Sequence, residues 1–274
     1  MVAMPGLRYS AVGATQLENG AGASKFTLAV LPDRSGNIRP GVFRRIAAQV
    51  ELMHPDFAVF IGDAIEITGA STPEEEEVAL LHVEWDGFFD ELAPLTRPVY
   101  FVPGWHDYKS PLHALVYHHR LGADFYSWDY RGCHFIALNC YDAFVKGEAP
   151  RSAVWRVGET QMQWLAADVR ASSSAAHTVL FVHAFYESME RSEICGLLAD
   201  RSHTIISGSS HAYRKTSCGG CTYYVVGTAG GYSPLDGPED GTVDHFLWMT
   251  IEDGIPHIAN VLIDSVLADD FCTE

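Results

Sequence analysis

The amino-acid sequence predicts an α/β protein in which a mixed-sheet β-sandwich is flanked by helices. Three observations support this prediction. Strand-like runs alternate with helical patterns in the first part of the chain, strand patterns dominate the last third, and polar residues directly follow several strands. Alternating strands and helices are typical of βαβ units, whereas consecutive strands indicate antiparallel additions to the same sheets.

The first two strands are predicted over residues 25–32 (KFTLAVLP) and residues 55–63 (PDFAVFIGD). Between them, Val42, Ile46 and Val50 recur at helical spacing, so we expect a helix over the segment GVFRRIAAQVELM. These three elements together predict a first βαβ unit.

A second helix is predicted after Pro73, because residues 74–77 are all glutamate and carboxylates suit the positive end of a helix dipole. The acidic run is therefore a solvated helix start. The third strand is predicted over residues 97–104 (RPVYFVPG).

The remaining elements are predicted in a different order. A hairpin over residues 124–139 turns at Arg131-Gly132, and a helix over 159–172 leads into a strand over 177–183. A further strand pattern covers residues 203–211. Three more lie in the last third, reading TYYVVGTAGG, DHFLWMTIED and PHIANVLID.

The chain has 274 residues, 47% of them hydrophobic, which is enough for one full-sized core. Residues 1–24 are small, polar and rich in glycine and alanine, so we expect a flexible N-terminal arm before a single domain over residues 25–274. No apolar run has the length of a membrane span or the character of a signal peptide. A cytoplasmic location is the expectation.

The formal net charge is −17, with 18 basic and 35 acidic residues. Such a field repels nucleic acid and anionic membranes, so we expect a small-molecule substrate as the partner. The sequence does not indicate an oligomeric state. Six cysteines are expected to be reduced thiols, and Cys218-Gly-Gly-Cys221 is interpreted as a hairpin turn, since a structural zinc site needs a second cysteine pair.

Polar residues that could bind a ligand follow five of the predicted strands. They are Asp33, Asp63, the pair His106 and Asp107, His183, and His211. A single aspartate in such a place is often only a helix N-cap. Several in chain order, each closing an apolar strand, favour a shared site at one edge of the sheets.

These motifs resemble those of the calcineurin-like metallophosphoesterases. The matching stretches are Asp33-Arg34-Ser35, Gly62-Asp63, Gly104-Trp105-His106-Asp107, His183 and Gly208-Ser209-Ser210-His211. The stretch PDRSG is similar to a bacterial branch whose first motif is Asp-Arg-Thr. The resemblance covers roughly residues 26 to 266 and implies the αββα arrangement of that family.

The resemblance implies two metal ions that activate a phosphoryl group. The first metal would be bound by Asp33, Asp63, His211 and the residue at position 35, where Ser35 replaces a histidine. The second would be bound by Asp63 and by the residues at positions 105, 183 and 209. His106 would protonate the leaving group, oriented by Asp107.

Two departures from the family pattern affect the second metal. Trp105 replaces an amide ligand although indole nitrogen only donates, and Ser209 replaces an imidazole. The second position then retains only Asp63 and His183, whereas Asp33, Asp63 and His211 suit one divalent cation such as Mn²⁺, Fe²⁺ or Mg²⁺. We therefore predict one divalent metal or none, with Asp33, Asp63, His211 and His183 as the candidate ligands.

Arg34, Trp105 and Arg214 are the candidate substrate-binding residues. Arg34 and Arg214 lie beside the motifs and could bind an anion. Trp105 could pack against a flat or apolar substrate, or could merely fill the space of a lost metal.

Three functions remain open from the sequence. The first is hydrolysis of a small phosphate ester at a reduced, one-metal site, with His106, Asp107 and Asp63 as catalytic residues. The second is a repurposed enzyme of secondary metabolism that uses the same pocket for metal-independent acid/base chemistry, such as cyclisation, elimination or rearrangement. The third is a non-catalytic pseudoenzyme of the same fold.

Overall fold

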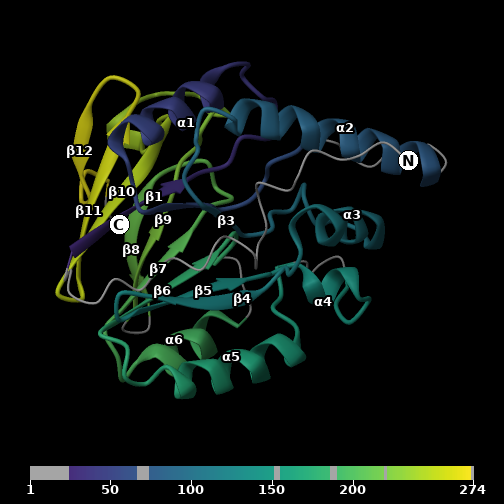
Figure 1. Cartoon of the computed structure of the whole chain (residues 1–274). Coiled ribbons are helices and arrows are strands. Elements are labelled where there is room, and N and C mark those ends of the chain that lie inside the picture. The colour runs from purple at the N-terminus through teal and green to yellow at the C-terminus, as the bar shows by residue number, and fades with distance from the viewer. Residues whose placement is uncertain (1–24, 67–73, 151–154, 186–189, 219–220, 273–274) are drawn as a thin grey trace.

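The computed structural model describes residues 25–66, 74–150, 155–185, 190–218 and 221–272. Two six-stranded mixed sheets pack face to face, and a layer of helices covers the outer face of each sheet (Figure 1). α1 and α2 cover the first sheet, and α5 and α6 cover the second. The predicted helix-flanked sandwich is confirmed.

The first sheet has the strand order β12-β11-β10-β1-β2-β3. β1, β2 and β3 are parallel, and β10 to β12 add antiparallel strands on the other side of β1. The strands of this sheet are β1 (Lys25–Leu31), β2 (Phe57–Phe60), β3 (Val99–Phe101), β10 (His245–Glu252), β11 (Ile255–Leu262) and β12 (Val266–Ala268).

The second sheet has the strand order β4-β5-β6-β7-β9-β8. Its four central strands are parallel, and β4 and β8 form its antiparallel edges. The strands are β4 (Tyr126–Tyr130), β5 (Cys133–Leu138), β6 (His177–Val182), β7 (His203–Ser207), β8 (Arg214–Cys218) and β9 (Cys221–Val225).

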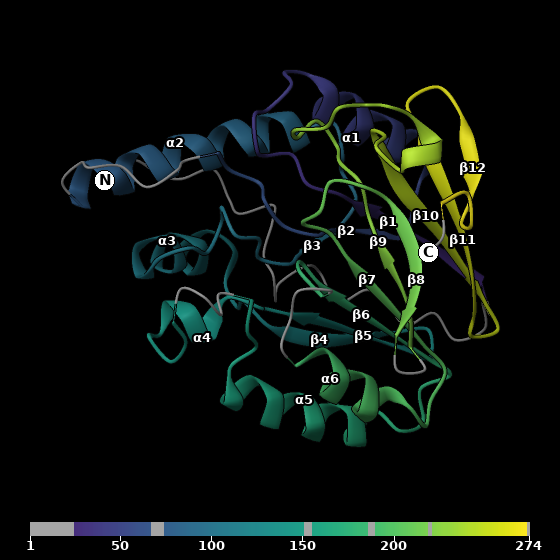
Figure 2. The ribbon, with the colours of Figure 1, turned by 180° about the vertical axis from the view of Figure 1, so that it is seen from behind.

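The helices that pack on the two sheets bury one face each. α1, for example, buries Phe43, Ile46 and Val50 on one face. α3 and α4 lie together at one end of the sandwich (Figure 2). The α-helices are α1 (Val42–Met53), α2 (Glu74–Leu92), α3 (Pro111–Leu121), α4 (Asp142–Val145), α5 (Glu159–Ala171) and α6 (Arg191–Leu198). In the described residues, no helix has the length and apolar character needed to cross a membrane.

Aromatic side chains fill the space between the two sheets. Tyr100 of β3 stacks on Trp128 of β4 with ring centroids 4.0 Å apart, and Phe57 of β2 meets Phe135 of β5 edge to face at 5.3 Å. Phe57, Tyr100 and Phe135 belong to one continuous buried cluster, and the partly buried Trp128 packs against it. These aromatic contacts join the two sheets, so the core fixes how the strand ends of one sheet face those of the other.

The predicted elements agree with the structure except at strand ends. The strand expected over 55–63 spans only 57–60, and that expected over 97–104 spans only 99–101, because the backbone leaves the sheet before Gly62 and Gly104. The hairpin interpretation of Cys218 and Cys221 is confirmed, since these residues pair across β8 and β9. The N-terminal arm predicted over residues 1–24 lies outside the described residues.

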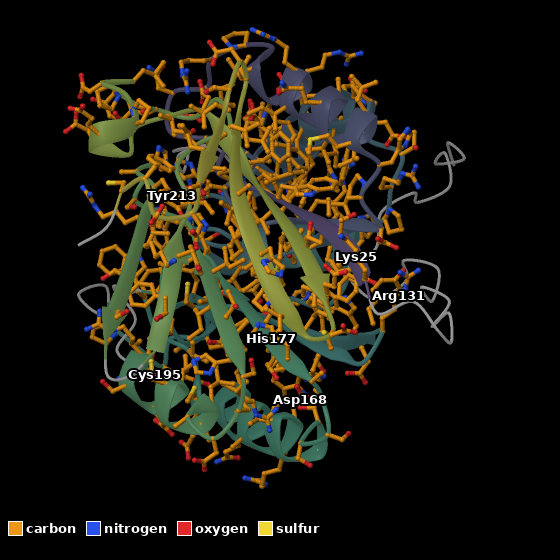
Figure 3. All side chains as sticks on the ribbon, turned by 90° about the vertical axis from the view of Figure 1, so that its left-hand side faces the viewer. Lys25, Arg131, Asp168, His177, Cys195 and Tyr213 are labelled. Carbon is orange, nitrogen blue, oxygen red and sulfur yellow. The ribbon has the colours of Figure 1, made fainter. Side chains whose placement is uncertain are left out.

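A buried histidine links the second sheet to its helical layer. His134 of β5 lies between two carboxylates, with Nδ1 2.7 Å from Asp129 and Nε2 2.8 Å from Asp168 of α5. Although burial disfavours the charged ring, the hydrogen bonds and charges of Asp168 and Asp129 raise the pKa of His134. Figure 3 shows Asp168 on the helical layer and, not far from it, His177, a second buried histidine whose partners are the hydroxyls of Ser202 and Thr204.

We expect His134→Gln to lower the free energy of unfolding by roughly 1–2 kcal/mol below pH 6, where the protonated ring bonds both carboxylates. Because the folded pKa of His134 is raised, this contribution is fully present below the unfolded pKa of about 6.5 and is lost as pH rises through the folded pKa. Urea unfolding of both proteins between pH 5 and 9 measures the difference.

His177→Gln is the matched control with the opposite sign. Burial, and then the charge of His203, lower the pKa of His177 to about 4. Its contribution is therefore present above about pH 6.5 and is lost as pH falls towards 4. A stability difference for His134→Gln that does not change with pH would contradict the charged arrangement.

Candidate functional site

The carboxyl ends of parallel strands from both sheets meet at one place. Asp33 follows β1, Asp63 follows β2, His183 directly follows β6, and His211 follows β7. Asp33 forms an isolated β-bridge with Thr228, and its carbonyl accepts hydrogen bonds from the N–H of Ala229 (2.7 Å) and from the Thr228 hydroxyl (3.0 Å). The sandwich therefore brings together side chains that are up to 178 positions apart in the sequence.

Three glycines allow the strand ends to approach each other. A Cβ on Gly104 would lie 2.1 Å from the backbone nitrogen of Asp63, and one on Gly62 would lie 2.7 Å from Nδ1 of His183. A Cβ on Gly208 would lie 2.7 Å from Oδ1 of Asp33. Contacts this short exclude any side chain at these positions, so the site depends on glycine.

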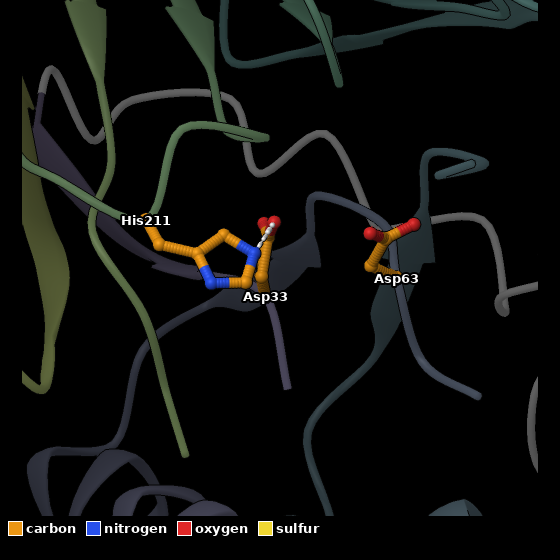
Figure 4. A group of neighbouring side chains, drawn as sticks. All are labelled: Asp33, Asp63 and His211. Carbon is orange, nitrogen blue, oxygen red and sulfur yellow. Dashed lines mark ion pairs between the residues drawn. The ribbon is translucent and has the colours of Figure 1, made fainter. Parts of the chain in front are cut away.

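Asp33, Asp63 and His211 form a compact group, which we call the three-residue cluster (Figure 4). Their ligand atoms all lie within 4.8 Å of one another, and Nε2 of His211 is 3.1 Å from Oδ2 of Asp33. Asp33 is fully buried and Asp63 is 5% exposed. The structure thus brings together the three residues that the sequence predicts as ligands of one metal.

His183 lies beside the cluster and faces both carboxylates. Its Nε2 is 3.6 Å from Oδ2 of Asp63 and 3.8 Å from Oδ2 of Asp33. The Nδ1 atoms of His183 and His211 lie 2.7 Å and 2.6 Å from the carbonyls of Ile61 and Tyr232. A carbonyl only accepts, so each Nδ1 carries the proton, and each Nε2 is directed to the cluster in the manner of a metal ligand.

The two carboxylates of the cluster are compensated by the positive charge of neighbouring histidines. Although burial disfavours its charged form, the charge of His183 keeps the pKa of Asp63 well below its usual range. Burial likewise opposes the charged imidazoles, but Asp63 and Asp33 raise the pKa of His183 to about 10 and Asp33 raises that of His211 to about 9. Two protonated histidines therefore balance two carboxylates when no cation is bound.

Several buried polar atoms of the site have no hydrogen-bond partner among the described residues. They are Oδ1 of Asp33, Nε2 of His183 and the hydroxyl of Ser35. Buried groups of this kind are costly unless a ligand or ion satisfies them. Two carboxylates and an imidazole suit a hard or borderline divalent cation, so the residues present fit one such ion.

Aromatic rings surround Trp105, at the position where the family resemblance implies a ligand of a second metal. Trp105 is half-buried, and its ring centroid lies 5.7 Å from that of Tyr141 and 5.6 Å from that of Phe144 of α4. Ser209 adopts a left-handed backbone conformation with φ 72°. Tyr141 was not predicted from the sequence. The feature that places Tyr141 at the site is the parallel pairing of β5 with β6, because the residues after β5 then reach the same sheet edge as His183.

Asp107, which the sequence analysis expects to orient His106, contacts the backbone of two loops. Its two oxygens accept hydrogen bonds from four backbone N–H groups, those of Asp63 (2.8 Å), Ala64 (2.8 Å), Ile65 (3.3 Å) and Gly104 (2.9 Å). Asp107 therefore ties the loop after β2 to the loop after β3. His106 donates its backbone N–H to Oδ1 of Asp63 at 2.8 Å, and its Nδ1 has no partner in the described part of the chain.

Arg34, a predicted substrate-binding residue, is engaged by groups of the protein itself. Its Nη1 donates to the carbonyl of Ala64 at 2.6 Å and its Nε to Glu91 at 3.2 Å, with the side chain 7% exposed. These contacts use the guanidinium to hold the loop after β2. Arg214 donates to Sγ of Cys272, so its role in substrate binding stays a prediction. Lys109 is half-buried and interacts electrostatically with Asp63.

Solved structures match this chain over most of its length, whereas no family profile and no curated protein matches it. A dimetal phosphatase from Danio rerio superposes with a TM-score of 0.64 at 14% identity, over 90% of this chain and 99% of its own. GAP50, the anchor in the inner membrane complex of Plasmodium, gives 0.63 at 11% identity over 91% of both chains. PhoD gives 0.62 at 10% identity over 91% of this chain and 69% of its own.

These similarities establish the fold and nothing finer. Two six-stranded mixed sheets flanked by helices form the calcineurin-like phosphoesterase fold. The resemblance stated from the sequence motifs is therefore confirmed at the level of the fold, and the site must be argued from its own residues.

We expect Asp107→Asn to destabilise the protein by about 2 kcal/mol or more, because an amide NH₂ cannot accept the backbone N–H groups that one carboxylate oxygen now accepts. A loss of that size corresponds to a fall in Tm of roughly 5 °C for a chain of this length. Thermal unfolding measures it. Asp253→Asn makes the same change at an exposed aspartate and should leave Tm unchanged. If Asp107→Asn keeps the wild-type Tm but loses activity, the result would contradict this expectation and favour the catalytic interpretation of Asp107.

Proposed function

We propose that the protein hydrolyses a small phosphate ester with one divalent cation bound at the three-residue cluster. The observation that carries the proposal is the buried pair Asp33 and Asp63 with His211, whose ligand atoms converge within 4.8 Å. The calcineurin-like phosphoesterase fold supports the general class. Manganese, iron(II) and magnesium are the cations that this donor set suits.

Each residue of the cluster has a defined part in this proposal. Asp33, Asp63 and His211 would hold the cation, which, when bound, supplies a Lewis acid for the phosphoryl group. Nε2 of His183 faces both carboxylates and would complete the ligand set from the second sheet. The two histidines already present Nε2 to this place because backbone carbonyls hold their other nitrogens.

His106 is the proposed acid for the leaving group. Its backbone is fixed to Oδ1 of Asp63, so its half-exposed ring lies next to the cluster. An imidazole titrates near neutral pH and can give a proton to a departing oxygen. Lys109, whose charge interacts with Asp63, replaces Arg34 as the proposed basic contact for the substrate anion.

The aromatic rings of Trp105, Tyr141 and Phe144, which we call the aromatic wall, favour a second candidate function. Trp105 packs with Tyr141 and Phe144 where the family resemblance implies ligands of a second metal. Such a wall suits an apolar substrate, so acid/base chemistry on a secondary metabolite without phosphoryl transfer is the alternative. GAP50, described as an anchor, shares the fold, and a non-catalytic role is the third candidate. For each enzyme we propose a small-molecule substrate and a cytoplasmic location.

We expect the protein to hydrolyse an aryl phosphate such as p-nitrophenyl phosphate only with a divalent cation, and Asp63→Asn to lower kcat/KM at least a hundredfold, because one cation ligand loses its charge. Assays with Mn²⁺, Mg²⁺ and Fe²⁺ after chelation and dialysis measure this. Asp253→Asn, remote in sequence and exposed, controls for the loss of one carboxylate. Undiminished hydrolysis after exhaustive metal removal would contradict the proposal.

A further inference from the structure

Tyr141 lies at the same edge of the second sheet as the cluster, three residues after the end of β5. Its ring centroid is 5.7 Å from that of Trp105 and 5.9 Å from that of His183. Tyr141 therefore contacts both the tryptophan that offers no metal ligand and the histidine that faces the two carboxylates.

The hydroxyl of Tyr141 is buried without a hydrogen-bond partner of normal geometry among the described residues. The thiol of Cys140 acts on it, but a thiol is a weak hydrogen-bonding group. Tyr126 shows the usual arrangement, since its hydroxyl accepts from the N–H of Phe101 and donates to the carbonyl of Phe101, both at 2.9 Å. An unpaired buried hydroxyl destabilises a fold, so the one on Tyr141 calls for a partner from outside the chain.

The ring of Tyr141 lies against that of His183, whose Nε2 faces both carboxylates of the cluster. Neither carboxylate accepts a hydrogen bond from the Tyr141 hydroxyl in the described structure. The acceptor must therefore arrive with a ligand of the cluster.

We propose that the Tyr141 hydroxyl donates a hydrogen bond to a non-bridging oxygen of a phosphate group bound at the three-residue cluster. The inference rests on the proposed function, because that function brings a phosphate oxygen to the cation. A fixed donor aimed at developing negative charge in a buried site is an effective stabiliser of phosphoryl and acyl transfer. Tyr141 would then supply, beside Trp105, part of the charge stabilisation that a second cation gives in a dimetal site.

Tyr141→Phe tests this directly, because it removes the hydroxyl and keeps the ring against Trp105 and His183. Titration calorimetry of the Mn²⁺-loaded protein with inorganic phosphate should show a dissociation constant raised about tenfold or more, with Mn²⁺ affinity unchanged. The Tm should stay close to that of the wild-type protein, because only the weak interaction of the hydroxyl with the Cys140 thiol is lost.

Tyr126→Phe is the matched control. It removes a hydroxyl with two backbone partners, so it should lower Tm and leave phosphate affinity unchanged. Wild-type phosphate affinity in Tyr141→Phe would overturn the inference and leave the proposed function standing, as would a fall in Tm like that of Tyr126→Phe. Phosphate binding that depends on Tyr141 without any ester hydrolysis would instead overturn the proposed function alone. Failure of the wild-type protein to bind phosphate would overturn both.

Discussion

The structure depends on one electrostatic constraint, the burial of two carboxylates side by side. Asp33 is fully buried and Asp63 nearly so, and like charges at this separation require positive charge beside them. His183 and His211 provide it in the metal-free chain, and a divalent cation would replace their protons. The glycines at the strand ends and the backbone hydrogen bonds to Asp107 maintain this arrangement, because they hold the loops after β2 and β3 in contact.

The strand and helix patterns predict the sandwich, and apolar strands that end in polar residues favour a shared site at one sheet edge. The choice of Asp33, Asp63 and His211 as ligands of one cation is what the family resemblance implies. The sequence does not show which groups the motif residues contact. Asp107 and Arg34 lie in the motifs, yet backbone groups of neighbouring loops bond both, and such contacts depend on tertiary structure.

Tyr141 is not predicted as a site residue for a related reason. The hairpin pattern of 124–139 does not indicate that β5 also pairs parallel with β6.

Trp105 occupies the position where the family resemblance implies a ligand of a second metal. Trp105 contributes no ligand atom, and its ring packs with Tyr141 and Phe144 instead. Asp107 accepts a hydrogen bond from the N–H of Gly104 in the loop that carries Trp105. The proposed single cation and tyrosine donor, together with the tryptophan, would give a site whose chemistry differs from that of a dimetal phosphatase with the same fold.

Metal stoichiometry tests the central claim most directly. Elemental analysis of protein purified without chelator, alongside the double variant Trp105→Asn with Ser209→His, compares one cation position with two. The account predicts about one divalent ion per chain in the wild-type protein and close to two in the variant, because an amide and an imidazole restore ligands at the second position. Two tightly bound ions in the wild-type protein, or none at all, would contradict it.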